Sequence, residues 1–328
     1  MAGLFDSWQR QVNYLRISVT DHCNLNCVYC SVGEIPRLRR EDILSYEEIE
    51  KVVRVAAEMG ITKVRLTGGE PLMRPHFCQL VRILAQIEGI DDLSLTSNGI
   101  LLARYADELK EAGLKRVNIS LDTLKRERYK QITGLDKLKD VLAGIEAAHK
   151  AGLEPVKINM VVLGGKNDDE VVDLAQKTIK DGWHVRYIEF MPIGVANGEV
   201  SGMVSTREIQ ERIQMLGELE PYAGPGGNGP ARYYRLPGAN GTIGFITPMT
   251  EHFCHSCNRL RITSDGQLRP CLLADDEVNL KEALRNGAVT DEIKQLIQRA
   301  VNLKREQHQL TGGIAPETVN RPMCQIGG

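Results

Sequence analysis

The sequence predicts an α/β fold built mainly from strand–helix units that follow one another along the chain. Six short runs rich in aliphatic and β-branched residues recur after residue 12. Stretches with helical periodicity separate these runs, and such units in series give parallel strands joined by right-handed crossovers. In five of the runs polar and apolar residues alternate, so one face of the predicted sheet is polar.

The strands are expected at residues 13–20, 61–67, 92–97, 116–122, 156–162 and 184–191. Helices are expected between them, near 46–59, 75–88, 101–112, 136–150 and 168–180. Ser45 followed by Glu48 is typical of a capping box at the start of the first helix. Glycines mark the ends of several helices, at Gly60, Gly113, Gly152 and Gly182.

The alternation decides between an open doubly wound sheet and a barrel. Strands covered by helices on both faces read as continuous apolar runs. Here Arg16, Ser18 and Thr20 alternate with Leu15, Ile17 and Val19. The next four expected strands show the same alternation of polar and apolar residues. A sheet with one solvated face is the alternative, but it fits poorly with helical crossovers. We therefore predict an incomplete, TIM-like (β/α)6 barrel whose polar face lines a lumen.

A change of composition divides the chain. The segment AGPGGNGPA, residues 223–231, cannot easily hold regular structure. We expect a barrel domain over residues 1–222 and a smaller α+β domain over 223–328. The second domain should hold short strands within 233–236 and 241–247, a hairpin at 258–268 that turns at "SDG", helices near 277–286 and 290–304, and an irregular tail.

Composition narrows the classes of function. With 328 residues and a net charge of -2, a surface that binds nucleic acid throughout is disfavoured. The N-terminus lacks the apolar core of a signal peptide, and no apolar run is long enough to span a membrane. These features predict a cytoplasmic protein without a membrane or nucleic-acid partner. In that compartment the eight cysteines are expected to be thiols or metal ligands rather than disulfides.

Six of the cysteines form two triplets. Cys23, Cys27 and Cys30 lie within "DHCNLNCVYC", and Cys254, Cys257 and Cys271 lie within "FCHSCNRLRITSDGQLRPCL". Cys78 is expected to be a small buried residue of a helix, and Cys324 a free thiol of the tail. Zinc completed by His22, His252 or His255 is an alternative, mainly for the second triplet.

The position of the first triplet favours a catalytic role over a structural metal site. It directly follows the first strand, and therefore lies at the carboxyl end of the barrel, where active sites of such folds occur. Three thiolates leave one iron of a cubane iron–sulfur cluster with an open coordination position.

The motif CNLNCVYC, with Tyr29 before its third cysteine, resembles the CxxxCxxC motif of the radical S-adenosylmethionine (SAM) superfamily. The segment TGGEPL, residues 67–72, resembles the glycine-rich SAM-binding segment of that superfamily. The second cysteine triplet and the closing "QIGG" are similar to signatures of the branch that cyclises GTP, and the similarity runs from about residue 10 to Gly328. Ser31, where methionine is common, and Cys324 depart from that pattern.

The resemblance implies two [4Fe-4S] clusters, one on Cys23, Cys27 and Cys30 and one on Cys254, Cys257 and Cys271, with SAM as the missing ligand of the first. It implies SAM contacts from Tyr29, Gly69, Ser120 and Met191. It implies GTP contacts from Arg16, Arg65, Thr96, Lys157, Arg259 and Arg261, with Lys63 and Arg186 as further candidates. Arg259, Arg261, Gly327 and Gly328 would act in catalysis, the last two by entering the active site.

The alternation of residues along the strands supports the implied GTP site without the resemblance. Arg16, Lys63, Arg65 and Lys157 share the polar face by alternation alone, and a confined cationic cleft suits a triphosphate.

The implied reaction is the first step of molybdenum cofactor biosynthesis. A radical derived from SAM would abstract hydrogen from C3′ of GTP, and C3′ would then attack C8, giving (8S)-3′,8-cyclo-7,8-dihydroguanosine 5′-triphosphate. The expected partners are GTP, a one-electron reductant of the flavodoxin type, and a cyclic pyranopterin monophosphate synthase that receives the product. The oligomeric state stays open, a homodimer included.

Two rival functions remain. A peptide-modifying radical enzyme would need auxiliary cysteines beyond the second triplet, and a zinc protein that binds nucleotides would contain no iron.

Overall fold

The computed structural model describes residues 3–30, 37–191, 193, 202–226, 229–308 and 321–327. The six expected strands are confirmed as β1 (Tyr14–Ser18), β2 (Lys63–Thr67), β3 (Asp92–Ser97), β4 (Arg116–Ser120), β5 (Lys157–Val162) and β6 (His184–Glu189). The helices between them are α1 (Tyr46–Glu58), α2 (Phe77–Ala85), α3 (Leu102–Glu111), α4 (Arg126–Thr133), α5 (Leu138–Lys150) and α6 (Val171–Lys180). The capping box of Ser45 and Glu48 is present at the start of α1.

The remaining elements are shorter. They comprise α7 (Thr206–Ile213), β7 (Glu220–Tyr222), β8 (Arg232–Arg235), β9 (Thr242–Ile246), β10 (Arg259–Ile262), β11 (Gln267–Arg269), β12 (Val278–Asn279), α8 (Leu280–Arg285), α9 (Thr290–Asn302) and α10 (Met323–Ile326). The strands β10 and β11 form the antiparallel hairpin expected from the "SDG" turn. The sequence did not predict α4, α7, β7, β12 or α10, and the last is a helical turn in a tail expected to be irregular.

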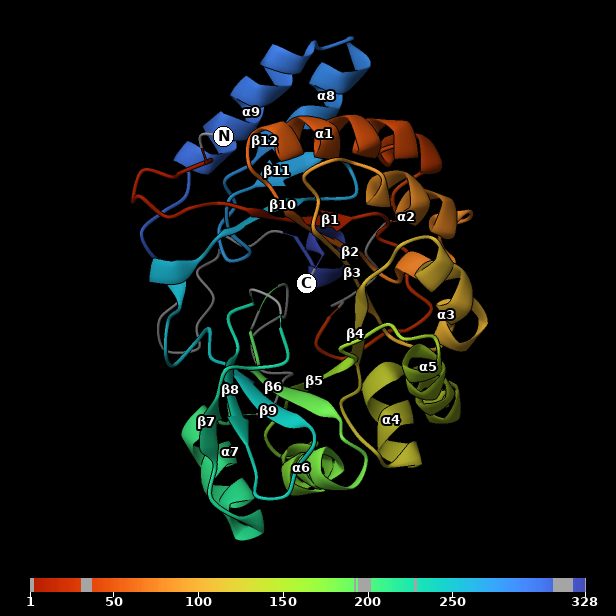
Figure 1. Cartoon of the computed structure of the whole chain (residues 1–328), viewed down its shortest axis with the longest axis vertical. Helices are drawn as coiled ribbons and strands as arrows, with labels where there is room; N and C mark the ends of the chain where they lie inside the picture. The colour runs from red at the N-terminus through yellow and green to blue at the C-terminus, as the bar shows by residue number, and fades with distance from the viewer. Residues whose placement is uncertain are drawn as a thin grey trace.

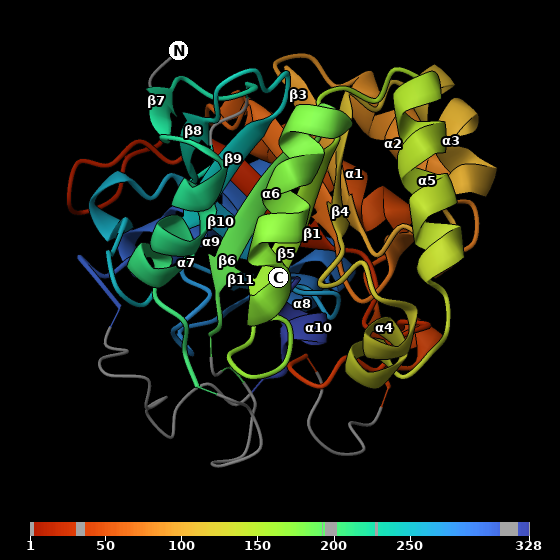
Figure 2. The ribbon, with the colours of Figure 1, turned by 90° about the horizontal axis from the view of Figure 1, so that it is seen from below.

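All described strands belong to one curved sheet in the order β12-β11-β10-β1-β2-β3-β4-β5-β6-β9-β8-β7. From β10 to β9 in this order every neighbouring pair is parallel. The sheet curls around a central space, with α1 to α6 on its outer side (Figure 1). From the other direction α6 crosses the outer face of β5 and β6 (Figure 2). The predicted incomplete barrel is confirmed.

The C-terminal residues extend this barrel at both edges. Strand β10 pairs with β1, and β9 pairs with β6, so residues after 240 flank the six predicted strands on either side. The expected division of the chain at residue 222 remains a prediction.

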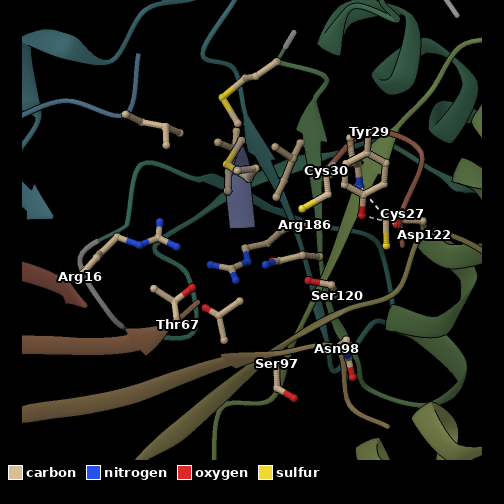
Figure 3. A pocket seen from close by; sticks show the side chains of 18 of the residues that line it. Arg16, Cys27, Tyr29, Cys30, Thr67, Ser97, Asn98, Ser120, Asp122 and Arg186 are labelled. Atoms are coloured by element: carbon tan, nitrogen blue, oxygen red, sulfur yellow. Dashed lines mark hydrogen bonds between the residues drawn. The ribbon is translucent and has the colours of Figure 1, made fainter. Parts of the chain in front are cut away.

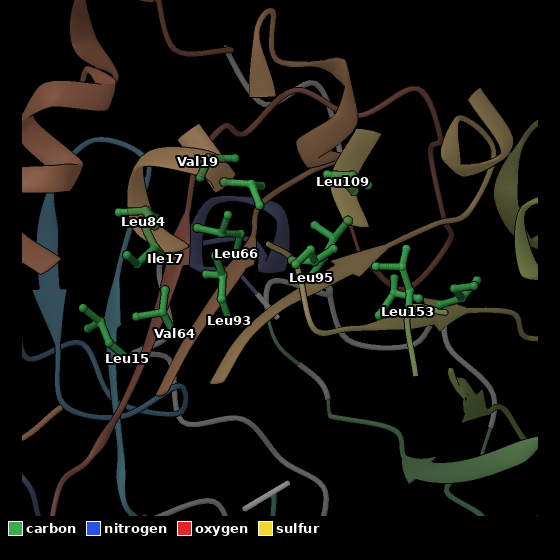
Figure 4. Close-up of a cluster of buried hydrophobic side chains, with 14 of the residues drawn as sticks. Leu15, Ile17, Val19, Val64, Leu66, Leu84, Leu93, Leu95, Leu109 and Leu153 are labelled. Atoms are coloured by element: carbon green, nitrogen blue, oxygen red, sulfur yellow. The ribbon is translucent and has the colours of Figure 1, made fainter. Parts of the chain in front are cut away.

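The outer face of the sheet is the main hydrophobic core. Leu15 and Ile17 of β1 and Leu66 of β2 are at most 1% exposed. They lie with Leu84 of α2 and neighbouring aliphatic side chains in one layer between strands and helices (Figure 4). Each such buried side chain contributes about 1.5–3 kcal/mol. Because this face holds the apolar residues, the alternating polar residues must point into the barrel.

No helix in the described part of the chain is long and apolar enough to cross a membrane.

Candidate active site

A cavity occupies the inside of the barrel. Its lining includes many residues that the sequence marked as candidates: Arg16, Cys23, Cys27, Tyr29, Cys30, Arg65, Gly69, Thr96, Ser120, Arg186, Met191, Arg259 and Arg261. Figure 3 shows the guanidinium groups of Arg16 and Arg186 directed into this space, with the Cys30 thiol on another side of it. Lys63, Lys157 and Gly327 are not among the lining residues, and Gly328 lies outside the described residues.

Strand register explains why the arginines gather. Arg16 pairs with Arg65 of β2 on one side and with Arg261 of β10 on the other, so three guanidinium groups lie at one level of the barrel. Arg186 of β6 approaches from the opposite wall and is 4% exposed. Burial and the neighbouring guanidinium of Arg259 lower the pKa of Arg261 to about 10.

These cations have few anionic partners. Among the described residues no carboxylate forms an ion pair with Arg65, Arg186, Arg259 or Arg261. Arg65 donates to Ser94 Oγ at 3.2 Å, and Nε of Arg186 is buried without a hydrogen-bond partner. Buried charges without counter-charges are costly, so this arrangement is suited to an anionic ligand.

Lys157 lies beside this group. Its side chain is buried, and Nζ donates to the carbonyl of Gly226 at 2.5 Å. Burial, with Arg186, Arg116 and Arg65 nearby, lowers the pKa of Lys157 to about 6.

The first triplet lies beyond the carboxyl end of β1, as expected. Tyr29 donates its hydroxyl to Asp122 at 2.6 Å, and this bond holds the tyrosine ring beside Cys27 and Cys30 (Figure 3). Burial raises the pKa of Asp122 to about 6. The Cys30 thiol shares a hydrogen bond with Cys324, which raises the pKa of Cys30 and lowers that of Cys324.

The glycine-rich segment after β2 packs directly on the loop after β1. The Gly69 amide donates to Thr20 O at 2.7 Å, and a Cβ at Gly69 would lie 2.3 Å from His22 O. Only glycine permits this approach. The buried carboxylate of Glu70 accepts from the amides of Leu72 and Asn98, and so ties the ends of β2 and β3 together.

The second triplet lies at the other end of the cavity. Cys254 and Cys257 precede β10, whereas the first triplet follows β1, and these two strands are parallel neighbours. The second triplet's cysteines do not themselves line the cavity, but the adjacent Phe253 and Leu272 do. Although burial opposes ionisation, Arg259 and Lys304 lower the pKa of the Cys257 thiol to about 6.

Both triplets have the chemistry of cluster ligands. All six cysteines are free thiols, and each triplet adjoins the same cavity from one end. Cationic donors beside Cys257 favour the thiolate, the form that binds iron.

Some residues of the site were not predicted. Tyr14 lines the cavity with a buried hydroxyl that has no partner among the described atoms, and it shares the alternating face of Arg16, which could have revealed it. Asp122 is the last residue of the strand expected at 116–122, and the sequence pattern gives it no role in the site. Lys304 carries no local signal, because its place depends on how α9 packs.

Comparison with known proteins finds two family models along the chain. Residues 17–178 match the radical SAM superfamily, and residues 183–310 match a family described as Molybdenum Cofactor Synthesis C. A protein of Moorella thermoacetica named GTP 3′,8-cyclase is 51% identical over 98% of this chain and 99% of its own. A protein of the same name from Pelotomaculum thermopropionicum is 52% identical, with the same coverage.

Solved structures support the fold. Streptococcus suis SuiB bound to S-adenosylmethionine matches with a TM-score of 0.63 at 14% identity, over 85% of this chain and 65% of SuiB. A structure of anSMEcpe with bound S-adenosylmethionine matches with a TM-score of 0.59 at 18% identity, over 88% of this chain and 78% of that one.

Proposed function

Because the chain belongs to the GTP 3′,8-cyclase family of radical SAM enzymes, we propose that its cavity converts GTP to (8S)-3′,8-cyclo-7,8-dihydroguanosine 5′-triphosphate, the first step of molybdenum cofactor biosynthesis. The observation that carries this proposal is the cation-lined cavity between two cysteine triplets. The positive charge of the wall complements the negative charge of a nucleoside triphosphate. The two triplets would place one cluster at each end of the bound nucleotide.

The cofactors are two [4Fe-4S] clusters and SAM. Cys23, Cys27 and Cys30 would hold one cluster, and Cys254, Cys257 and Cys271 the other. When bound, the first cluster and SAM supply an oxidant strong enough to remove a hydrogen atom from the ribose. Tyr29, Gly69, Ser120 and Met191 would contact SAM, and all four line the cavity.

The cationic wall would bind and orient GTP. Six residues that line the cavity would contact the nucleotide: Arg16, Arg65, Thr96, Arg186, Arg259 and Arg261. Lys157 and Lys63 lie on β5 and β2 outside this lining, and they would reach the nucleotide only beyond the cavity wall. Rigid strands carry these side chains, so the sugar would be held in one orientation toward the first triplet. Arg259 and Arg261 extend from β10 between the two triplets, and the Gly327–Gly328 tail would cover the reacting atoms and exclude water.

The physiological partners are proposals of the same kind. A flavodoxin-like protein in the cytoplasm would supply electrons, and a cyclic pyranopterin monophosphate synthase would take the product. A homodimer is one proposed assembly, and gel filtration with light scattering would test it.

The decisive experiment is anaerobic incubation of reconstituted protein with SAM, a strong reductant and GTP. We expect 5′-deoxyadenosine and the cyclised nucleotide to form in parallel. ATP and a cysteine-containing peptide are the control substrates. Cleavage of SAM with the peptide but not with GTP would contradict the proposed substrate, and a protein that binds only zinc would contradict the reaction class.

The affinity for GTP should depend on the protonation of Lys157. Its pKa is about 6 in the free protein because burial, Arg186, Arg116 and Arg65 disfavour its charge, while Asp92 favours it. A bound triphosphate would raise that pKa, so binding would take up a proton at any pH between the two values. Affinity should therefore fall as the pH rises, by up to about tenfold per pH unit.

Calorimetry from about pH 8 to about pH 9 measures this, because the terminal phosphate loses its last proton at about pH 6–7 and is therefore ionised throughout that range. Lys157→Met should remove the Lys157 contribution to the slope, and Lys157→Arg should keep high affinity across the range. An equal slope in wild type and Lys157→Met would show that Lys157 does not meet the triphosphate.

A further inference from the structure

Lys304 is a buried cation for which the proposed reaction gives no role. It lies two residues after the end of α9 and is 5% exposed. Its ammonium donates to the carbonyls of Arg259 and Pro270, each at 2.9 Å, and lies 3.7 Å from Cys257 Sγ. Several more exposed lysines instead pair with carboxylates, as Lys294 of α9 does with Glu58.

The two carbonyls belong to the segments that carry the second triplet. Arg259 follows Cys257 by two residues, and Pro270 immediately precedes Cys271. The hairpin of β10 and β11 separates these segments along the chain. One ammonium that binds both carbonyls therefore fixes the distance between Cys257 and Cys271.

The described side chains that donate to the Cys257 sulfur are both cations. Arg259 donates to the same sulfur at 3.4 Å, and neither Arg259 nor Lys304 forms an ion pair with any carboxylate of the described residues. Buried cations require a counter-charge. Among the described residues that contact both cations, the group that can supply it is the Cys257 thiolate, together with the anionic assembly that the triplet would hold.

The N-terminal segment keeps Lys304 in place. Trp8 Nε1 donates to the Lys304 carbonyl at 3.1 Å. Arg10 donates to the Cys254 carbonyl at 2.7 Å and, through the same guanidinium, to Glu306 and Arg305 carbonyls at 2.8 and 2.6 Å. The chain after α9 is thus tied to all three cysteine segments.

We propose that Lys304 is the positioning residue of the second triplet and that its charge raises the reduction potential of the iron–sulfur cluster bound there. The proposal rests on the function proposed above. A cation and a hydrogen-bond donor beside a ligating sulfur stabilise the reduced cluster, which carries one more negative charge.

The test uses the full chain with Cys23, Cys27 and Cys30 replaced by serine, so that bound iron and its potential report the second site alone. In this parent, Lys304→Met should shift the potential to more negative values and reduce bound iron. Lys304→Arg should restore both, since it keeps the charge and the donors. Lys294→Met, on the exposed side of α9, is the matched control and should change neither.

Equal iron content and equal potential in the parent and Lys304→Met would overturn the proposal. If Lys304→Met does not fold, Lys304→Gln replaces it, because it keeps donors without charge, and an unchanged potential in that variant is equally decisive. A parent that binds no iron would instead show that the second cluster itself is wrongly assigned. If the parent binds iron and the Lys304 variants have the same iron content and the same potential, only the role proposed for Lys304 is refuted.

Discussion

Deleting Gly327 and Gly328 is expected to abolish formation of the cyclised nucleotide while both iron–sulfur clusters remain bound. Arg261, which is 3% exposed, donates to the Gly327 carbonyl at 2.8 Å. The preceding Ile326 is fully buried in a small apolar cluster with Ile193, Met249 and Leu273. The tail is therefore anchored beside the cavity and attached to a guanidinium of its wall.

Gly327 also meets a steric requirement. Its φ is +78°, and a Cβ there would lie 2.8 Å from Thr67 Cγ2 and 3.1 Å from Ser18 Cβ, at the carboxyl ends of β1 and β2. Alanine at this position combines a left-handed backbone with a collision. Gly327→Ala should therefore lose most of the activity, although less than the deletion.

The measurement is product formation by chromatography together with iron content. Gly165→Ala is the matched control, because Gly165 has a similar φ of +72° with no neighbour within 4 Å of the added Cβ. It should keep full activity. Turnover at the wild-type rate by the truncated chain would show that the tail takes no part in the reaction.

The part of the fold that the sequence predicted follows from local pattern. Alternation along β1 to β5 determined which side chains point inward, because each polar residue has an apolar neighbour that must be buried. That single argument predicts that Arg16, Arg65 and Lys157 lie on the inner face. A separate observation, that the first triplet directly follows the first strand, predicts its place at the carboxyl end of the barrel.

The edges of the barrel could not be predicted in this way. Strand β10 joins β1 although more than two hundred residues separate them, and no local pattern records such a pairing. The sequence pattern does not predict the short helix α4, RERYKQIT, because only Tyr129, Ile132 and Thr133 of it are buried. A helix with so narrow an apolar face resembles a polar loop.

The metal bound by the second triplet also could not be predicted from local sequence. Its spacing alone allowed zinc or an iron–sulfur cluster. The pairing of β1 with β10 sets it across the cavity from the first triplet, and Lys304 and Arg259 surround Cys257 with positive charge. Both features depend on contacts between distant segments.

Replacing Cys27 with serine should eliminate cleavage of SAM and all product. Cys27 lines the cavity, and its thiol is buried beside Cys23, Tyr29 and Asp122. Serine has nearly the same size, so the packing should survive, but an alkoxide is not accessible at neutral pH and a hydroxyl is a poor ligand for iron.

The expected change in metal content is specific. The variant should lose about four of about eight irons per chain, because each triplet holds one four-iron cluster independently. The affinity for GTP should change less than about threefold, since a change below about 0.7 kcal/mol is expected when no wall cation is altered. Iron analysis, SAM cleavage and nucleotide binding by calorimetry measure the three quantities.

Cys78 provides the matched control for this substitution. It is also buried, but it lies on α2 in the outer hydrophobic layer and its thiol meets Glu108 rather than the cavity. Cys78→Ser should therefore lower the stability modestly and keep all iron and activity. If Cys27→Ser retained its full iron and cleaved SAM, the first triplet could not be the site of the first cluster, and the orientation proposed for GTP in the cavity would be wrong.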